Sequence, residues 1–313
     1  MNSRERVFTT LRHDEPDRVP FNMRPSDIMR VRLQEETGNR DVDFAEHFGH
    51  DVQYVYIELP DRPKDIPLSE WTPRPTQEVI ASCSVQTKNI QDQGFAVCGA
   101  YMRGVFEEAK AWLGDAEVLA MPYNDPNRLE TVLDRITEWK MSIYAAYVRA
   151  GVDIVWIGDD LGQQRTLIMS PEHYREWYRP RHQEIVSHLR KIRDDVKIAF
   201  HSCGHITPLI PDLIELGVDI LEAVQPEAMD LAYLKKEFGR DIAFWGGVGC
   251  QSTFARSTPQ QVMESVRRTL NIMAPGGGYI AAPCHKLTDD IPWESVIAFN
   301  EAMNRYGVYP ISE

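Results

Sequence analysis

The chain has 313 residues, of which 43% are hydrophobic and 26% charged, so it can bury a large core and a largely disordered chain is excluded. The formal net charge of -13 at pH 7 excludes phosphate backbones as the main binding partner, because a nucleic-acid binder needs a basic face. The start of the chain, MNSRERVF, is charged, and no apolar stretch of about 18 residues follows it. We therefore expect a cytoplasmic protein with no nucleic acid and no membrane among its partners.

Short apolar and β-branched runs alternate with longer helical patterns, which is typical of βα units around a parallel sheet. Eight such runs predict strands. They cover residues 18–23, 52–57, 95–101, 152–158, 196–201, 218–224, 242–247 and 278–284. The proline-rich passage 60–75 reads as a surface loop.

Helix boundaries are marked between these runs. Asp125, Ser170 and Thr258 each precede a proline, as N-cap residues do, and Gly151 and Gly217 mark helix ends. Eight strands with intervening helices predict an α/β fold, a (β/α)8 TIM barrel with a short N-terminal helical extension, formed as one domain over residues 1–313. A doubly wound sheet is disfavoured, because no glycine-rich phosphate loop follows an early strand.

In a TIM barrel the active site lies at the carboxyl ends of the strands, so the residues that follow each run are the candidates. This set is polar and rich in sulfur. It comprises Arg24, Arg103, Asp159, Asp160, His201, Cys203, Gln225, Cys284 and His285.

His201 and Cys203 form the first candidate metal-binding pair. Residues i and i+2 of an extended segment project from the same face, so the imidazole and the thiolate can reach one ion, and Gly204 permits a sharp exit. A catalytic zinc site has three protein ligands and one open position, and Cys284 at the end of the last strand is a candidate third ligand. Because these strand ends lie three strands apart, the ion would have to sit over the barrel mouth. The alternative is that His201 and Cys203 are two polar side chains at a strand end and bind no metal.

The other candidates also have two interpretations each. Asp159 and Asp160 are candidate catalytic residues, as a general acid or base or as partners of a zinc-bound histidine, or they cap a helix or form an ion pair. Arg24 and Arg103 could hold an anionic substrate tail, or serve in structural ion pairs.

Gln225 and His285 are the remaining candidate substrate-binding residues. Cys250 lies close enough to the predicted mouth to substitute as a sulfur ligand. The other thiols, Cys83 and Cys98, are expected to be structural, because five irregularly spaced cysteines do not form a disulfide framework.

Several segments resemble the uroporphyrinogen decarboxylase-like superfamily, and within it the zinc-dependent methyltransferases that handle methylcobamide. They are LRHDEPDRVP from Leu11, GDDLGQQ from Gly158, FHSCGH from Phe200, FWGGVGCQ from Phe244, and APGGGYIAAPCH from Ala274. The methyltransferase branch is marked by His-x-Cys followed by a distant Cys. Here His201, Cys203 and Cys284 match that pattern, and the two cysteines are 81 positions apart (284 − 203).

The resemblance implies a barrel with a deep cleft and Zn²⁺ held by His201, Cys203 and Cys284. It implies methyl transfer between a small substrate, either a thiol or a methoxy or methylated compound, and cobalamin, a corrinoid carried by a partner protein. The direction of transfer stays open. The helix expected over 126–150 offers a surface for a partner or a homodimer, although packing on the barrel explains it equally well.

Two other readings stay open. The first is a metal-free decarboxylase or lyase of the same superfamily, acting on a carboxylated small molecule or a tetrapyrrole. Arg24 lies roughly where this branch has an arginine for substrate acetate groups, but the next residues depart from the branch and no aspartate motif follows Tyr56. The second is a non-catalytic binding protein that keeps the cleft.

Overall fold

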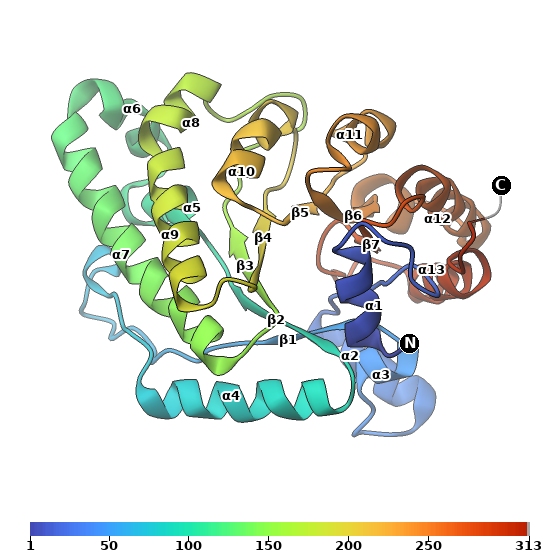
Figure 1. Cartoon of the computed structure of the whole chain (residues 1–313). Helices are drawn as coiled ribbons and strands as arrows, with labels where there is room; N and C mark the ends of the chain where they lie inside the picture. The colour runs from blue at the N-terminus through green and yellow to red at the C-terminus, as the bar shows by residue number, and fades with distance from the viewer. Residues whose placement is uncertain (312–313) are drawn as a thin grey trace.

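Seven parallel strands form the centre of the molecule in a computed structural model that describes residues 1–311. Each strand pairs with the next along the chain, and the sheet curls into a TIM-barrel-like half-barrel with helices around it (Figure 1). The strands are β1 (Val52–Val55), β2 (Ala96–Tyr101), β3 (Ile154–Gly158), β4 (Lys197–His201), β5 (Ile220–Ala223), β6 (Ala243–Val248) and β7 (Tyr279–Pro283). Seven of the eight predicted strands are therefore confirmed.

Helices precede the sheet, cover its outer face and fill the connections. The α-helices are α1 (Ser3–Thr10), α2 (Asp27–Thr37), α3 (Phe44–Phe48), α4 (Gln77–Asp92), α5 (Val105–Leu113), α6 (Asp115–Asn124), α7 (Pro126–Ala150), α8 (Pro171–Trp177), α9 (Arg179–Ile192), α10 (Ile210–Leu216), α11 (Leu231–Phe238), α12 (Pro259–Met273) and α13 (Trp293–Tyr306). Shorter turns are η1 (Leu68–Glu70), η2 (Thr207–Leu209) and the π-helical η3 (Cys250–Phe254). Within residues 1–311, no helix has both the length and the apolar character needed to cross a bilayer.

The helix boundaries follow the capping residues that the sequence displays. The side chains of Asp125, Ser170 and Thr258 each accept a hydrogen bond from a backbone N–H in the first turn of α7, α8 and α12. Gly151 and Gly217 end α7 and α10 in the left-handed conformation, which glycine adopts without steric cost. Local sequence therefore sets where these helices begin and end.

The alternation of side chains along the strands divides the core into two parts. Side chains on one face of the strands pack against the helices and form the larger group of buried apolar residues. Side chains on the other face form a smaller group that fills the barrel interior. The interior includes Trp156 of β3 and Trp245 of β6, both 1% exposed. Val7 and Leu11 pack against the same interior cluster, so α1 closes the end of the barrel where the strands begin.

The eighth predicted strand, at residues 18–23, is wrong, and the sheet is not an eight-stranded closed barrel. This segment makes only isolated bridges, such as Phe21 with Ala281 of β7. Its backbone still contacts both edges of the sheet, since the Asn22 N–H donates to Ala281 O (3.1 Å) and the Asp51 N–H donates to Phe21 O (2.9 Å). Pro20 has no N–H, so this part of the segment cannot form a continuous ladder.

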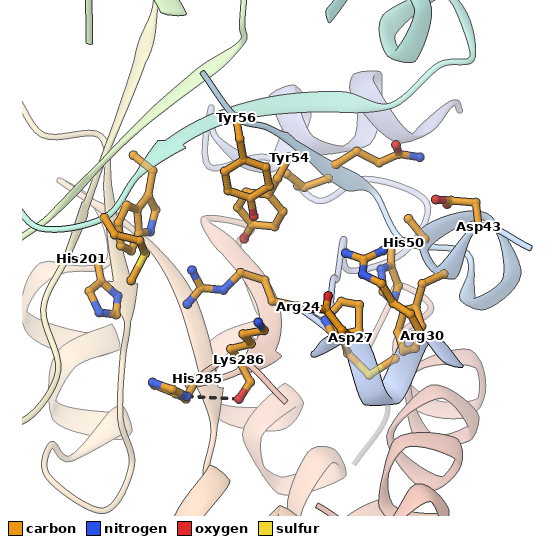
Figure 2. Close-up of a pocket in the computed structure, with 18 of the residues that line it drawn as sticks. Arg24, Asp27, Arg30, Asp43, His50, Tyr54, Tyr56, His201, His285 and Lys286 are labelled. Carbon is orange, nitrogen blue, oxygen red and sulfur yellow. Dashed lines mark hydrogen bonds between the residues drawn. The ribbon is translucent and has the colours of Figure 1, made fainter. Parts of the chain in front are cut away.

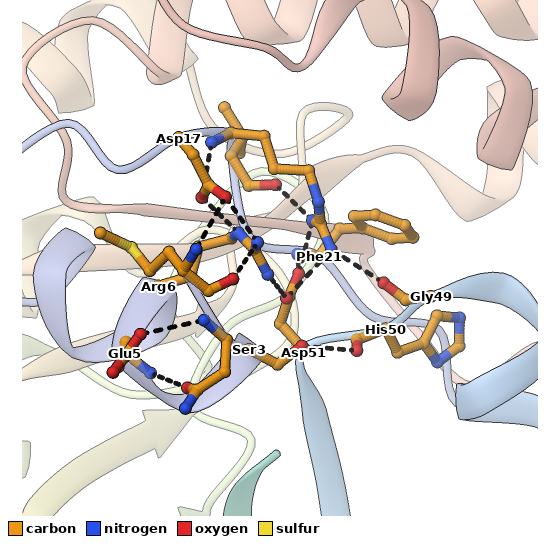
Figure 3. Close-up of polar contacts among 12 residues, drawn as sticks. Ser3, Glu5, Arg6, Asp17, Phe21, Gly49, His50 and Asp51 are labelled. Atoms are coloured by element: carbon orange, nitrogen blue, oxygen red, sulfur yellow. Dashed lines mark hydrogen bonds and ion pairs between the residues drawn. The ribbon is translucent and has the colours of Figure 1, made fainter. Parts of the chain in front are cut away.

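A buried ionic cluster fixes this segment to the start of β1 (Figure 3). The Asp51 side chain is fully buried and accepts hydrogen bonds from Arg6 Nη1 and Arg18 Nη1, both at 2.6 Å. It also accepts the backbone N–H of Phe21 at 2.9 Å. On the solvent side, Arg6 makes a second pair with Asp17, at 2.7 Å and 2.8 Å. One carboxylate therefore joins α1, the bridging segment and β1.

Replacing Asp51 by Ala should lower the free energy of unfolding by about 3–5 kcal/mol, because it leaves the buried Arg6 guanidinium without its inner partner. The matched control is Asp17→Ala, which removes the other carboxylate from the same arginine. The Asp17 side chain is 45% exposed, so the control should lose less than about 1 kcal/mol. Urea unfolding measures both, and equal losses would contradict the role assigned to Asp51.

Candidate metal centre

Three side chains with metal-binding atoms meet at the carboxyl ends of β3 and β4. Their ligand atoms, one each from Asp160, His201 and Cys203, all lie within 4.8 Å of one another, and this is the one such group within residues 1–311. Asp160 Oδ1 lies 3.3 Å from His201 Nε2, and Cys203 Sγ lies 3.6 Å from the same nitrogen. The spacing of His201 and Cys203 therefore brings imidazole and thiol together as expected, with Asp160 as their neighbour.

Close packing of the two loops after β3 and β4 creates this cluster. Ser202 Oγ accepts the N–H of Leu161 (2.9 Å), Gln163 O accepts the N–H of His205 (2.7 Å), and Asp160 Oδ1 accepts the N–H of Cys203 (2.8 Å). The backbones can approach this closely only because glycines stand at the contact. A Cβ on Gly204, whose φ is +78°, would lie 2.5 Å from Gln163 O, and a Cβ on Gly162 would lie 2.7 Å from Cys203 O.

The other nitrogen of His201 faces a buried carboxylate. His201 Nδ1 is in hydrogen-bond contact with Glu222, whose Oε2 also accepts the indole N–H of Trp156 at 2.8 Å. Glu222 lies directly opposite His201 in the register of β4 and β5. Arg24 approaches Glu222 from the cavity side, with Nη2 3.7 Å from Oε1. A carboxylate on one imidazole nitrogen orients the other nitrogen toward an ion.

The charges of the cluster are set by these contacts. Burial opposes ionisation of Asp160, but hydrogen bonds from His201 and from the Cys203 N–H outweigh it and lower the pKa of Asp160 to about 2. Burial alone would lower the pKa of His201, yet Glu222 and Asp160 hold that pKa well above its usual value. The pKa of Glu222 is lowered despite its burial, mainly by His201 and Arg24. These contacts favour a protonated His201 between two carboxylates, so a metal ion bound through Nε2 would take the place of a proton on that nitrogen.

Glu107 is a candidate that the sequence interpretation missed. It lies in the first turn of α5 and lines the cavity next to the cluster. Burial, followed by the charges of Asp160 and Asp159, raises the pKa of Glu107 to about 7. A carboxyl group with such a pKa can donate or accept a proton near neutral pH.

Glu222 was also missed, although it left a signal in the sequence. Glu222 is the single acidic residue in the apolar second half of the predicted strand 218–224. A charged residue in such a position is seldom buried unless it has a partner, so it points to a functional or paired charge inside the barrel. Glu107 left no such signal, because it lies in an ordinary amphipathic helix pattern.

Asp159 and Asp160 have different surroundings despite being adjacent. Asp159 is fully buried, accepts the N–H groups of Phe106 (2.9 Å) and Glu107 (2.8 Å), and contacts His182 Nε2 at 3.0 Å. These contacts hold the start of α5 and match the helix-capping alternative. A catalytic role for Asp159 stays a prediction, and Asp160 is the aspartate whose carboxylate belongs to the cluster.

Two cavities meet at Cys203. The first, of about 560 Å³, is lined by Arg24, Trp156 and the three residues of the cluster. Figure 2 shows the Arg24 guanidinium directed toward His201, with Tyr54 of β1 and Tyr56 beside it. The second, of about 480 Å³, is lined by Gln225, Cys250 and Cys284. Cys203 and His285 line both. A ligand in either cavity can therefore reach the cluster.

Cys284 lies apart from the cluster of three. Its Sγ donates to Val224 O at 3.2 Å, and burial, followed by the nearby Cys250, raises the pKa of its thiol well above the usual value. It shares the second cavity with Cys203, so its role as a zinc ligand stays a prediction.

Gln225 and Arg103 occupy different positions relative to the cavities. The Gln225 Oε1 accepts the N–H of Gly204 at 3.1 Å and so supports the loop that carries Cys203. Arg103 is half-exposed, has a φ of +61°, and lies with Nε 4.0 Å from Glu108 Oε2. It is absent from the described lining of both cavities, and its substrate-binding role stays a prediction.

A curled parallel sheet with polar residues gathered at its carboxyl end is the architecture of a TIM-barrel-type enzyme. A family model described as uroporphyrinogen decarboxylase (URO-D) matches residues 44–306, and the chain belongs to this family.

Individual relatives are distant. The uroporphyrinogen decarboxylase of Actinobacillus succinogenes is 24% identical over 193 residues, covering 61% of this chain and 52% of the relative. That of Pseudomonas fluorescens is 24% identical over 188 residues, covering 59% and 50%. The matched region thus spans about half the length of these curated relatives. A methyltransferase from Methanosarcina mazei has a similar structure, with a TM-score of 0.75 over 98% of this chain and 99% of that chain, at 18% identity. At that identity the likeness shows a shared fold.

Gly204→Ala should weaken metal binding, because its Cβ would push the loop of Cys203 away from the loop of Asp160. The matched control is Gly276→Ala. Gly276 has nearly the same φ, +76°, but no atom within 4 Å of an added Cβ. Both variants should lose about 1 kcal/mol of stability from the positive φ, Gly204→Ala should lose more because its Cβ also clashes with backbone atoms, and only Gly204→Ala should lose zinc affinity. Titration with zinc against a competing chelator measures this, and equal affinities in the two variants would contradict the loop contact as the cause.

Proposed function

We propose that this URO-D family enzyme is a zinc-dependent methyltransferase. It moves a methyl group between a small substrate, either a thiol or a methoxy or methylated compound, and cobalamin, a corrinoid held by a partner protein. The observation that carries the proposal is the convergence of Asp160, His201 and Cys203 within 4.8 Å beside a cavity of about 560 Å³. The structural likeness to a methyltransferase from Methanosarcina mazei supports it.

The donor set fits zinc. Imidazole nitrogen, thiolate and carboxylate are the ligands that Zn²⁺ takes in proteins, and a catalytic site uses three of them. His201 and Cys203 would be two ligands. The third would be Asp160, which is already in contact with His201, or Cys284, which the sequence resemblance favours. When bound, Zn²⁺ supplies a Lewis acid at the meeting point of the two cavities.

The chain's own residues supply positioning and proton transfer. Glu222 contacts His201 Nδ1 and so turns Nε2 toward Asp160 and Cys203. The Glu107 carboxyl, with a pKa of about 7, can take a proton from a substrate thiol or return one to a leaving group. Arg24 and His285 line the cavity and would hold an anionic tail of the substrate.

The alternative is a metal-free decarboxylase or lyase. The family description and the names of the curated relatives favour it, as does the position of Arg24 in the cavity. The close approach of the Cys203 thiol to the His201 imidazole favours the zinc enzyme. Decarboxylation of an acidic substrate gives no physical reason to place a thiol beside an imidazole. Release of CO₂ from uroporphyrinogen by the purified protein would support the alternative.

Purified protein should hold about one zinc per chain after incubation with zinc and removal of the excess, as a three-ligand site does. Cys203→Ala should lose most of it. The matched control Cys83→Ala makes the same change in α4, outside the lining of both cavities, and should keep it. Elemental analysis of the protein measures the metal, and wild-type protein that stays zinc-free would contradict the proposal.

Two further variants decide the third ligand. Loss of zinc from Cys284→Ala with retention in Asp160→Ala assigns the site to His201, Cys203 and Cys284, and the reverse assigns it to the cluster of three. Methyl transfer is then followed by the visible spectrum of methylcobalamin mixed with candidate thiols. We expect demethylation with wild-type protein and little with Cys203→Ala, and equal rates in both would contradict a catalytic role for the centre.

A further inference from the structure

A chain of three buried polar side chains joins α8 and α9 to the loop after β3. The Tyr174 hydroxyl lies 3.2 Å from His182 Nδ1, and His182 Nε2 lies 3.0 Å from Asp159 Oδ2. Each of the three residues is at most 1% exposed, and in the part of the chain that the structure describes none of them lines either cavity. Because a carboxylate accepts hydrogen bonds, Nε2 donates to Asp159 and Nδ1 is left to accept the Tyr174 O–H. The chain is therefore directed at Asp159.

The chain ends on the backbone of α5. Asp159 Oδ2 also accepts the N–H of Phe106 (2.9 Å), and Oδ1 accepts the N–H of Glu107 (2.8 Å). The residue before the helix is Gly104, which has no side chain to cap it, and a Cβ there would lie 2.8 Å from Asp159 Cγ. Asp159 therefore takes the place of an N-cap side chain and holds the first turn from a neighbouring strand end.

The residues on either side of Glu107 are anchored in the core. Phe106 is fully buried and packs edge-on against Tyr178, with ring centroids 5.2 Å apart. Glu108 is buried as well and pairs with Lys140 of α7 at 2.7 Å. Glu107 is only half-buried, and its side chain lines the first cavity. The contacts that fix the start of α5 therefore also fix which side chain of this turn faces the cavity.

We propose that Asp159 and His182, supported by Tyr174, are positioning residues that place the Glu107 carboxyl in the first cavity for proton transfer. Neither side chain touches the substrate, and both act through the start of α5. The inference rests on the proposed function, in which Glu107 takes the proton of a substrate thiol. The S–H bond breaks and an O–H bond forms on Glu107, with no change of oxidation state.

The charges around Glu107 fit this arrangement. Burial is the main cause that raises the pKa of Glu107 to about 7, followed by the charges of Asp160 and Asp159. Lys110 and His201 act in the opposite direction and lower that pKa. Loosening the first turn would expose the carboxyl to water, which stabilises its charged form. A break in the chain of hydrogen bonds is therefore expected to lower the pKa of Glu107.

Carbon-13 NMR of the glutamate carboxyls, with the Glu107 signal assigned by Glu107→Gln, tests the placement without turnover. In metal-free wild-type protein the Glu107 midpoint should lie near pH 7. His182→Phe keeps a ring but removes both hydrogen bonds, and it should lower the midpoint by about one unit, a tenfold change in proton affinity. Tyr174→Phe removes only the outer hydrogen bond and should lower the midpoint less.

The matched control is Tyr144→Phe. Tyr144 is as buried as Tyr174, but its hydroxyl has no hydrogen-bond partner among the described residues, so the midpoint should stay unchanged. A wild-type midpoint near that of an ordinary glutamate, no shift in His182→Phe, or an equal shift in Tyr144→Phe would overturn the proposal. Thermal unfolding checks that each variant folds, and Tyr174→Phe decides the question if His182→Phe does not fold.

Methyl transfer gives a second test, which separates positioning from general damage to the fold. His182→Phe should lower kcat about tenfold to a hundredfold with KM and zinc content little changed, because a misplaced proton carrier slows the chemical step. In a Glu107→Gln background the same substitution should have little further effect. A loss of the same size in that background would contradict action through Glu107.

The two tests also separate this proposal from the proposed function. Absence of methyl transfer in wild-type protein, with the NMR shift in His182→Phe intact, would remove the methyltransferase and leave the placement of Glu107 standing. Methyl transfer with no NMR shift would remove the positioning role alone.

Discussion

The candidate centre depends on one contact, the packing of the loop after β3 against the loop after β4. Gly162 and Gly204 let the two backbones approach to a distance that no side chain would allow. The hydrogen bond from the Cys203 N–H to Asp160 then fixes thiol and carboxylate relative to each other, while His201 is held at the end of its strand. Residues 43 positions apart in the chain (203 − 160) become neighbours because they directly follow two strands, β3 and β4, that are parallel and adjacent.

Buried charge extends this arrangement into the cavity. Glu222 lies between His201 and Arg24, so one carboxylate orients the imidazole and balances the guanidinium. Burying a carboxylate is unfavourable unless it is paired and hydrogen-bonded, and here His201, Trp156 and Arg24 provide those partners. The same network therefore links the candidate metal centre to the cavity wall on which a substrate would rest.

The features that depend on local sequence pattern, such as strands and the His201–Cys203 pair, could be predicted from the sequence. The contacts that depend on the register between strands could not. Apolar runs located seven strands, and the spacing of His201 and Cys203 located two members of the cluster. The segment 18–23 has the composition of a strand, but Pro20 cannot donate to a ladder, so it makes only isolated bridges. Glu222 meets His201 only because β4 and β5 pair in one register, which a single sequence does not reveal. Glu107 reaches the cavity through the start of α5, which Asp159 holds in place.

The central claim is that His201 and Cys203 bind one zinc ion through nitrogen and sulfur. X-ray absorption at the zinc edge tests it most directly, because it reports the atoms bound to the metal whatever the enzyme turns over. We expect sulfur at about 2.3 Å together with nitrogen or oxygen at about 2.0–2.1 Å, with the sulfur contribution reduced or lost in Cys203→Ala. A zinc ion surrounded only by oxygen, with the same spectrum in Cys203→Ala, would contradict it.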